Sequence, residues 1–249
     1  MYCYMTSNLM TLSCNFYCYR KKKKKINPVT NKSNNIDLVF FDMDGVLTDT
    51  ISSWKHIHDY FETSNEKSVE LYLKGKIDDL EFIKRDVGLW KINDEFVHID
   101  IIRNVLNKVN LMNGAKKCMS FLKNHNIKPV IVSAGLDILA NRVGDEIGIE
   151  HIYANGVLND ENGRLTGEGL LRVELTNKDK VVKEIAKDLH VELERCAAVG
   201  NSCFDVPMFE TCGVGIAFNP GDKCVRKLAD FIVEGKDLSK LIPVFQSFV

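Results

Sequence analysis

The sequence predicts an α/β protein built on a doubly wound parallel sheet with a small helical insertion. Short apolar runs rich in β-forming residues, such as "IDLVFFD" (36–42) and "KPVIVSAG" (128–135), alternate with amphipathic stretches of helical periodicity. These runs lack a polar face, which is typical of strands covered on both sides. Alternation of this kind gives a parallel sheet with helices on both faces.

Each element follows from the local pattern. After the first strand, residues 52–108 show apolar spacings of three and four in "VELYL" and "LEFIKRDVGLW", so we expect helices there. A helix over residues 114–126 precedes the strand at 128–135, and "YANGVLNDENGRLTGEG" (153–169) has the composition of a hairpin. The remaining elements are a helix "KDKVVKEIAKDLH", a strand "RCAAVG", a helix beginning "DVPMFETC", a strand "GVGIAF", a helix "DKCVRKLA" and a strand "DFIV".

Charge is distributed unevenly along the 249 residues, whose net charge is -1. Residues 1–35 hold seven basic residues and no acid, which leaves 26 basic against 34 acidic residues in the remainder. We expect residues 1–35 to be a disordered basic extension. The acidic body excludes a nucleic-acid binder, which needs a basic face. The apolar stretch near the start is too short and too polar to span a bilayer, so no stable membrane association is expected.

Eight cysteines are scattered through the chain, and no C-x-x-C pair occurs. Thiols in this pattern, without a secretory signal, indicate reduced cysteines in a cytoplasmic protein. Most of them are expected to be small buried apolar residues. The oligomeric state has no signal in the sequence.

Polar side chains gather where the predicted strands end. They are Asp42 and Asp44, Ser133, and Asn201 with Asp205. In an open parallel sheet, ligands bind beyond the carboxyl ends of the strands. Residues two apart in extended backbone face the same way, so Asp42 and Asp44 can converge. Two close carboxylates repel unless a cation joins them or one is protonated, and oxygen ligands of this type favour Mg²⁺.

These residues resemble the four ordered motifs of the haloacid dehalogenase superfamily. "DMDGV" (42–46), Ser133, the Lys178 region and "VGNSCFDVPMF" (199–209) stand in the same order, over about residues 36–245, and the closest similarity is to the phosphoserine phosphatase-like branch. The resemblance implies a Rossmann-like core formed by residues 36–51 and 109–249. It also implies a small helical cap formed by residues 52–108.

The resemblance implies that Asp42 is a nucleophile that carries the phosphoryl group as an aspartyl phosphate. A carboxylate suits this role because it is already ionised near neutral pH. Asp44 would protonate the leaving oxygen and then activate the hydrolytic water. Ser133, with the backbone N–H groups of Ala134 and Gly135, would hold phosphate oxygens.

A lysine is required to bring an anionic nucleophile to an anionic phosphate. Lys178 falls at the family's position, with Lys180 as the alternative. Mg²⁺ would be bound by Asp42, Asp44, Asn201 and Asp205.

Asn201 departs from the family pattern, which has an aspartate at this position. An amide oxygen can bind a hard cation but brings no charge, so weaker Mg²⁺ binding is expected, with Asp205 acting directly or through water. The alternative is much reduced activity. Phe204 is expected to be a packing aromatic, and His56 and His58 to belong to an ordinary cap surface.

The predicted function is a phosphomonoester hydrolase acting on a small phosphorylated metabolite. Phosphoserine is the best substrate candidate, although the family's cap glutamate falls on Ile51 and its arginine near Asp86, beside Arg85. Two alternatives stay open. One is a phosphotransferase or mutase, and the other is a phosphate-binding homologue weakened by Asn201.

Overall fold

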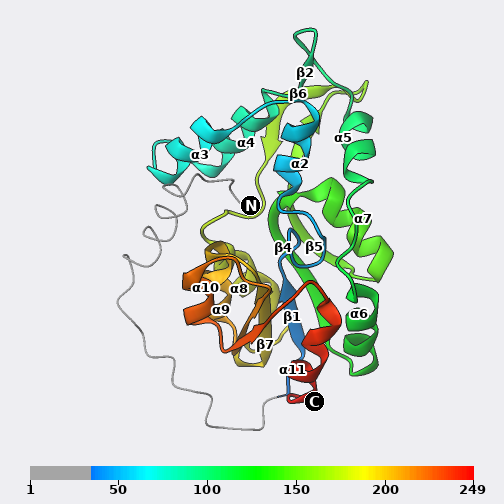
Figure 1. The fold of residues 1–249 in the computed structure, drawn as a ribbon, viewed down its shortest axis with the longest axis vertical. Helices are drawn as coiled ribbons and strands as arrows, with labels where there is room; N and C mark the ends of the chain where they lie inside the picture. Colours follow the sequence, from blue (N-terminus) through cyan, green and yellow to red (C-terminus); the bar gives the residue numbers. More distant parts are fainter. Residues whose placement is uncertain (1–34) are drawn as a thin grey trace.

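A computed structural model describes residues 35–249 and shows an α/β fold (Figure 1). Nearly all of the predicted basic extension, residues 1–35, lies outside the described residues. Seven strands form one sheet in the order β6-β5-β4-β1-β7-β8-β9. Only β6 is antiparallel to its neighbour, and the other pairs are parallel, which confirms the predicted sheet and the hairpin. The strands are β1 (Leu38–Phe41), β4 (Lys128–Leu136), β5 (His151–Asn159), β6 (Leu165–Leu170), β7 (Cys196–Gly200), β8 (Val214–Phe218) and β9 (Phe231–Val233).

Strand β1 lies at the centre of the sheet, and its four residues are buried. Because alternate side chains point to opposite faces, Val39 and Phe41 pack into one apolar cluster, while Leu38 and Phe40 pack into another. This double burial explains why the sequence run has no polar face.

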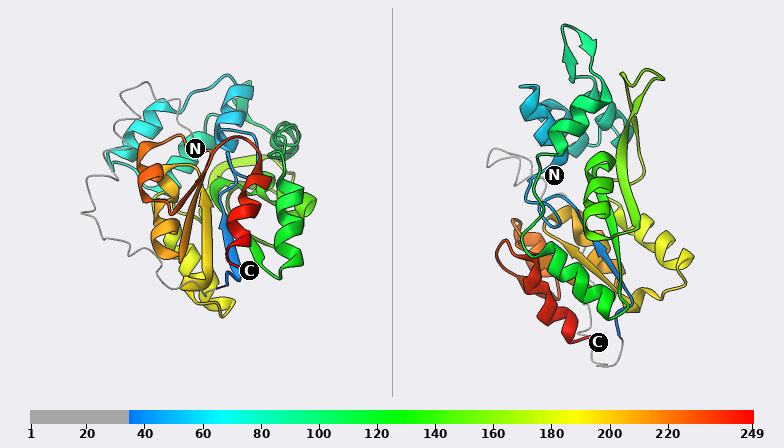
Figure 2. Two further views of the ribbon diagram at one scale, coloured as in Figure 1. Left: turned by 60° about the horizontal axis from the view of Figure 1, so that its bottom comes forward. Right: turned by 90° about the vertical axis from the view of Figure 1, so that its right-hand side faces the viewer.

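Helices cover both faces of the sheet, as the views in Figures 1 and 2 show. One face carries α6 (Ala115–Asn124), α7 (Asp137–Ile147) and α11 (Ile242–Gln246). The other face carries α8 (Lys178–Asp188), α9 (Val206–Thr211) and α10 (Lys223–Leu228). This arrangement leaves the carboxyl ends of the central strands open toward the insertion that follows β1.

The insertion contains four helices and a small hairpin. Two adjacent residues of the "IND" turn, Asn93 and Asp94, adopt positive φ angles of 50° and 63°, which suits a tight two-residue hairpin turn. The expectation of helices throughout residues 52–108 was therefore wrong at this point. The elements are α2 (Ser53–Tyr60), α3 (Glu66–Leu73), α4 (Asp79–Val87), β2 (Lys91–Ile92), β3 (Glu95–Phe96) and α5 (Ile99–Leu106).

Helix α4 packs directly on β6, which fixes the insertion above the sheet. A Cβ atom on Gly169 would lie 2.0 Å from Ile83 Cγ2, so only glycine permits this close approach. Lys84 and Glu168 add an exposed ion pair of 2.6 Å across the same contact. The β5–β6 hairpin therefore supports the cap as well as extending the sheet.

His58 is buried, contrary to the expectation of a cap surface. Its Nδ1 lies 2.8 Å from Thr63 Oγ1, and its Nε2 lies 3.4 Å from the Asp86 carboxylate. The Trp90 ring meets the His58 imidazole edge-on. Helix α2 ends at Tyr60, so Glu62 does not share a helical face with His58.

The cysteines and the lengths of the helices bear on two further expectations. Cys118, Cys196, Cys203 and Cys224 are buried and form no disulfide, which agrees with their expected role as small apolar residues. No helix within residues 35–249 has the length and apolar character needed to cross a membrane.

Candidate active site

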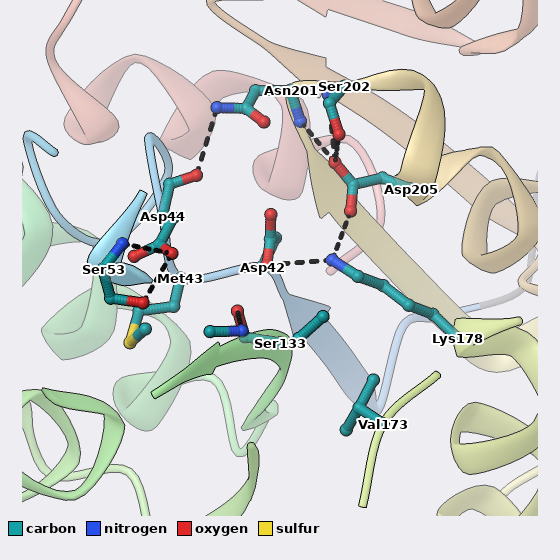
Figure 3. Close-up of polar contacts among 12 residues, drawn as sticks. Asp42, Met43, Asp44, Ser53, Ser133, Val173, Lys178, Asn201, Ser202 and Asp205 are labelled. Atoms are coloured by element: carbon teal, nitrogen blue, oxygen red, sulfur yellow. Dashed lines mark hydrogen bonds and ion pairs between the residues drawn. The ribbon is translucent and has the colours of Figure 1, made fainter. Parts of the chain in front are cut away.

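The candidate site lies at the carboxyl ends of three adjacent parallel strands. Phe41 of β1 pairs with Ile131 of β4 on one side and with Val199 of β7 on the other. This register brings the residues that follow β1 and β7, together with Ser133 of β4, to one edge of the sheet (Figure 3). The structure therefore places all the predicted site residues together, namely Asp42, Asp44, Ser133, Ala134, Lys178, Asn201 and Asp205.

Lys178 is the central cation of the site. It is the first residue of α8, and its side chain is 2% exposed. Its Nζ lies 2.9 Å from Asp42 Oδ1 and 2.7 Å from Asp205 Oδ1. Lys180, the alternative, is exposed and pairs with Glu174 at 2.6 Å. The geometry therefore favours Lys178 as the lysine of the site.

Asp205 fastens the loop that follows β7. Its Oδ2 accepts hydrogen bonds from the backbone N–H of Asn201 at 2.9 Å and from that of Ser202 at 3.0 Å. The Ser202 hydroxyl adds a third bond at 3.2 Å. Because Oδ1 accepts from Lys178, both carboxylate oxygens of Asp205 are engaged. This favours contact with a metal through water over direct ligation.

Asp44 is held in place by the first residue of α2. The backbone N–H of Ser53 donates to Asp44 Oδ2 at 2.8 Å, and the Ser53 hydroxyl donates to the same oxygen at 2.9 Å. The Ser53 hydroxyl also accepts the backbone N–H of Leu136 at 3.0 Å. Asp44 Oδ1 is buried and has no hydrogen-bond partner within the described part of the chain.

Asn201 lies directly against the "DMDG" loop. Its side-chain Nδ2 donates to the main-chain carbonyl of Asp44 at 3.2 Å. Gly45 makes this contact possible, since its φ is +75° and a Cβ atom there would lie 2.1 Å from Asn201 Nδ2. A glycine therefore follows the two acids for two reasons. Its backbone is left-handed, and the Asn201 side chain lies too close for a Cβ atom.

Ser133 and Ala134 lie near the end of β4, and Ser133 lies on the opposite side of Asp42 from Asn201 (Figure 3). The Ser133 hydroxyl oxygen accepts the backbone N–H of Gly135 at 3.1 Å. That N–H is thus already paired, and the Ser133 O–H proton is available to donate elsewhere. The Ala134 carbonyl accepts the Trp54 indole N–H at 2.9 Å, which ties α2 to the site.

The buried charges shift one another's ionisation. Burial is the largest influence on Asp42 and opposes its ionisation, but favourable interactions that include the charge and hydrogen bond of Lys178 and a hydrogen bond with the Met43 backbone together hold the pKa of Asp42 below its usual range. Burial raises the pKa of Asp44, and the Asp42 charge acts in the same direction. Two carboxylates two residues apart therefore differ in proton affinity.

A pocket of about 530 Å³, including its open mouth, lies above these residues. The cap supplies much of its wall through Trp54 of α2 and through Asp79, Phe82, Ile83 and Asp86 of α4. The sequence analysis named Asp86 only as the position near which the family's arginine falls, and it named none of the other four as site residues. The four residues of α4 share a helical spacing, which the sequence showed as a helical face but not as a pocket lining.

Comparison with known proteins identifies the family. The family model described as haloacid dehalogenase-like hydrolase matches residues 36–213 of this chain. The chain belongs to the haloacid dehalogenase-like hydrolases. This result confirms the predicted superfamily and the predicted broad class of enzyme, a hydrolase.

Similar proteins include phosphoserine phosphatases. This hydrolase is 28% identical over 215 residues to the phosphoserine phosphatase of Archaeoglobus fulgidus, covering 84% of this chain but only 60% of that protein. It is 26% identical over 211 residues to the enzyme of Methanocaldococcus jannaschii, covering 82% of this chain and 95% of that protein.

Solved structures confirm the fold of this hydrolase. A phosphoserine phosphatase solved as an analogue of its phospho-aspartyl intermediate matches with a TM-score of 0.72 at 24% identity. That match covers 84% of this chain and 99% of the other. A substrate-bound phosphoserine phosphatase matches with the same TM-score and identity, over 84% of this chain and 98% of the other.

The residues of this hydrolase fit a divalent cation. Two buried carboxylates, those of Asp42 and Asp205, contact the Lys178 ammonium, which leaves one negative charge uncompensated by this cation. The buried Asp44 Oδ1 lacks a hydrogen-bond partner within the described residues. The donors are oxygens, the type that Mg²⁺ prefers.

Proposed function

We propose that this protein is a Mg²⁺-dependent phosphomonoester hydrolase that works through an aspartyl phosphate on Asp42. The observation that carries the proposal is the buried contact of 2.9 Å between Asp42 and Lys178 at the carboxyl end of β1. It supplies an ionised nucleophile together with a fixed cation that offsets the repulsion between carboxylate and phosphate.

Asp44 is proposed as the general acid and base. Its raised pKa supports a protonated carboxyl group that donates to the leaving oxygen. Once the alcohol has left, the resulting carboxylate removes a proton from the water that attacks the aspartyl phosphate. Ser53 holds this carboxyl group by two hydrogen bonds, so it keeps its orientation through both steps.

The phosphate is proposed to lie between Ser133 and Lys178. The Ser133 hydroxyl proton and the backbone N–H of Ala134 supply donors on one side, and the Lys178 ammonium supplies charge on the other.

Mg²⁺, when bound, would neutralise charge that develops on the phosphoryl oxygens. Asp42 and Asn201 are proposed to bind it, and Asp205 to reach it through water. The Oδ1 of Asp44, which has no hydrogen-bond partner within the described residues, is left to carry the proton that goes to the leaving oxygen.

Phosphoserine is the substrate named for the relatives, and it is the first candidate for this chain. Its amino group would meet the acidic residues of the cap. Its carboxylate is less well matched, because Lys178 is the only basic side chain that lines the pocket in the described part of the chain, and it is already paired with two acids.

A phosphate-release assay with p-nitrophenyl phosphate and Mg²⁺ tests the proposal. We expect release by the wild type, loss of release in Asp42→Asn, and acid-stable labelling of the wild type at Asp42 on rapid quenching. Phosphoryl transfer to an added alcohol in place of water would indicate a phosphotransferase or mutase. Ligand binding without any release would indicate a phosphate-binding homologue, and either result would overturn the proposal.

A further inference from the structure

One face of α4 supplies the cap side of the pocket. Asp79, Phe82, Ile83 and Asp86 stand three or four residues apart and all line it. The Asp79 carboxylate is occupied in part, because its Oδ1 accepts the Leu175 backbone N–H at 2.7 Å. The same face therefore offers two acids and an apolar strip to a bound molecule.

Asp86 is the acid with unused bonding capacity. It is 2% exposed, and its Oδ2 accepts a hydrogen bond from Asn65 Nδ2 at 2.8 Å. Its Oδ1 is buried and has no hydrogen-bond partner among residues 35–249. A buried carboxylate oxygen without a donor is costly, so a donor on the ligand would be strongly favoured here.

Among residues 35–249, the pocket wall has no basic side chain besides Lys178, which is already paired with two acids, to match a second anionic group. Arg85, next to Asp86 in sequence, is exposed and pairs with Glu81 at 2.7 Å, so it lies on the solvent side of α4. Ile51, which stands where the family pattern has a glutamate, is 42% exposed and does not line the pocket. A substrate carboxylate would therefore be placed beside acids without a partner, which is unfavourable.

Aromatic rings complete the wall. Trp54, Phe82 and Phe204 line the pocket. The Trp54 ring packs at a tilt against Trp90, with centroids 5.5 Å apart, and the Phe82 ring stacks against Tyr72 at 5.2 Å, so both rings are fixed before a ligand binds. Aromatic faces attract cations and repel anions, which acts in the same direction as the carboxylates.

We propose that the pocket selects the phosphate monoester of an amino alcohol that carries an ammonium group and no carboxylate, and that Asp86 binds the ammonium. This inference rests on the proposed phosphatase function, because it assumes that the phosphate lies at Asp42. The ammonium would donate to Asp86 Oδ1 while the alcohol's carbon chain lies along the aromatic wall.

The decisive comparison uses phosphoethanolamine and phosphoserine, which differ only in the carboxylate. We expect kcat/KM of the wild type for phosphoethanolamine to exceed that for phosphoserine by about tenfold or more, the effect of one unpaired buried charge. Equal values, or a preference for phosphoserine, would overturn the inference and leave the phosphatase function intact.

Calorimetric binding of the same two esters separates the two proposals. If no phosphate monoester, including p-nitrophenyl phosphate, is hydrolysed, the proposed function fails. Tighter binding of phosphoethanolamine would still support the selectivity of the pocket, and tighter binding of phosphoserine would refute it.

Asp86→Asn tests the residue itself, since the amide keeps the shape of the side chain and removes its charge. We expect the wild type also to prefer phosphoethanolamine over glycerol 3-phosphate, which has no ammonium group. In Asp86→Asn, KM for phosphoethanolamine should rise about tenfold, with a smaller change in kcat, and this preference should disappear. Arg85→Gln, on the solvent face of the same helix, is the matched control and should keep the preference. A preference retained in Asp86→Asn would exclude Asp86 as the ammonium site, and the wild-type comparison decides the substrate class even where this variant fails to fold.

Discussion

The side-chain amide of Asn201 donates a hydrogen bond of 3.2 Å to the main-chain carbonyl of Asp44. A neutral side chain thus joins the loop after β7 to the loop after β1, at a position where the family pattern has an aspartate. An aspartate could not donate this bond and would add a negative charge beside Asp42 and Asp44. The contact links the stability of the metal-free protein to its affinity for a cation.

Asn201→Asp is therefore expected to have opposite effects on stability and on metal binding. Without metal, the lost hydrogen bond and the added repulsion should lower the free energy of unfolding by about 1–2 kcal/mol. Affinity for Mg²⁺, measured by calorimetry, should rise about tenfold or more because a charged oxygen replaces a neutral group.

Asn107→Asp, at an exposed position at the end of α5, adds the same charge far from the site and is the control. Mg²⁺ affinity that is the same in wild type and Asn201→Asp would remove residue 201 from the metal site.

Gly45→Ala tests the close approach of the two loops. The positive φ of +75° imposes a backbone cost of about 1 kcal/mol on any other residue, and the new Cβ atom would lie 2.1 Å from Asn201 Nδ2. Gly148 has φ +76° with no atom within 4 Å, so Gly148→Ala isolates the backbone cost. Urea unfolding should show Gly45→Ala to be less stable than Gly148→Ala by a further 1–3 kcal/mol or so. Equal losses in the two variants would mean that Asn201 moves aside freely.

The site residues that lie at the carboxyl ends of the strands could be predicted, because the register of a parallel sheet brings these ends together. In a parallel sheet, residues that end neighbouring strands must meet, so Asp42, Ser133 and Asn201 were found from sequence alone. Lys178 lies on a helix, and its position was inferred from family resemblance instead.

The cap could be predicted only as helical. The apolar spacing along α4 shows that the helix has a face, but not that this face meets a pocket, because that depends on how α4 rests on β6. The burial of His58 likewise depends on Asp86, 28 positions away, and the spacing within α2 carries no trace of it. Such contacts between distant segments have no local signature.

Lys178→Met is expected to lower stability as well as activity. It removes the single cation from between Asp42 and Asp205, both buried, and leaves their charges unpaired. Loss of one partner from a buried ion pair typically costs about 3–5 kcal/mol. Lys180→Met, two residues along α8, breaks an exposed pair with Glu174 and should change stability by no more than about 0.5 kcal/mol. Comparable urea midpoints for the two variants would contradict the central place of Lys178.

Ser53→Ala is expected to move the alkaline limb of the pH–rate profile to higher pH. Burial raises the pKa of Asp44, while the hydrogen bonds from Ser53 favour the charged form and lower it. Removing the hydroxyl leaves only the backbone N–H bond, so the pKa of Asp44 rises further. A general acid is active when protonated, and its activity is lost as pH rises through its pKa, so the loss should begin at higher pH in the variant.

Ser52→Ala supplies the control for this shift. Its hydroxyl caps α2 by accepting the Lys55 backbone N–H at 3.2 Å, so its loss should cost stability of about 1 kcal/mol without touching Asp44. The profile of kcat/KM for glycerol 3-phosphate, whose alkoxide leaving group needs a proton, should therefore keep its alkaline limb in Ser52→Ala and shift it upward in Ser53→Ala. A downward shift in Ser53→Ala, or the same shift in both variants, would rule out Asp44 as the group whose protonation sets that limb.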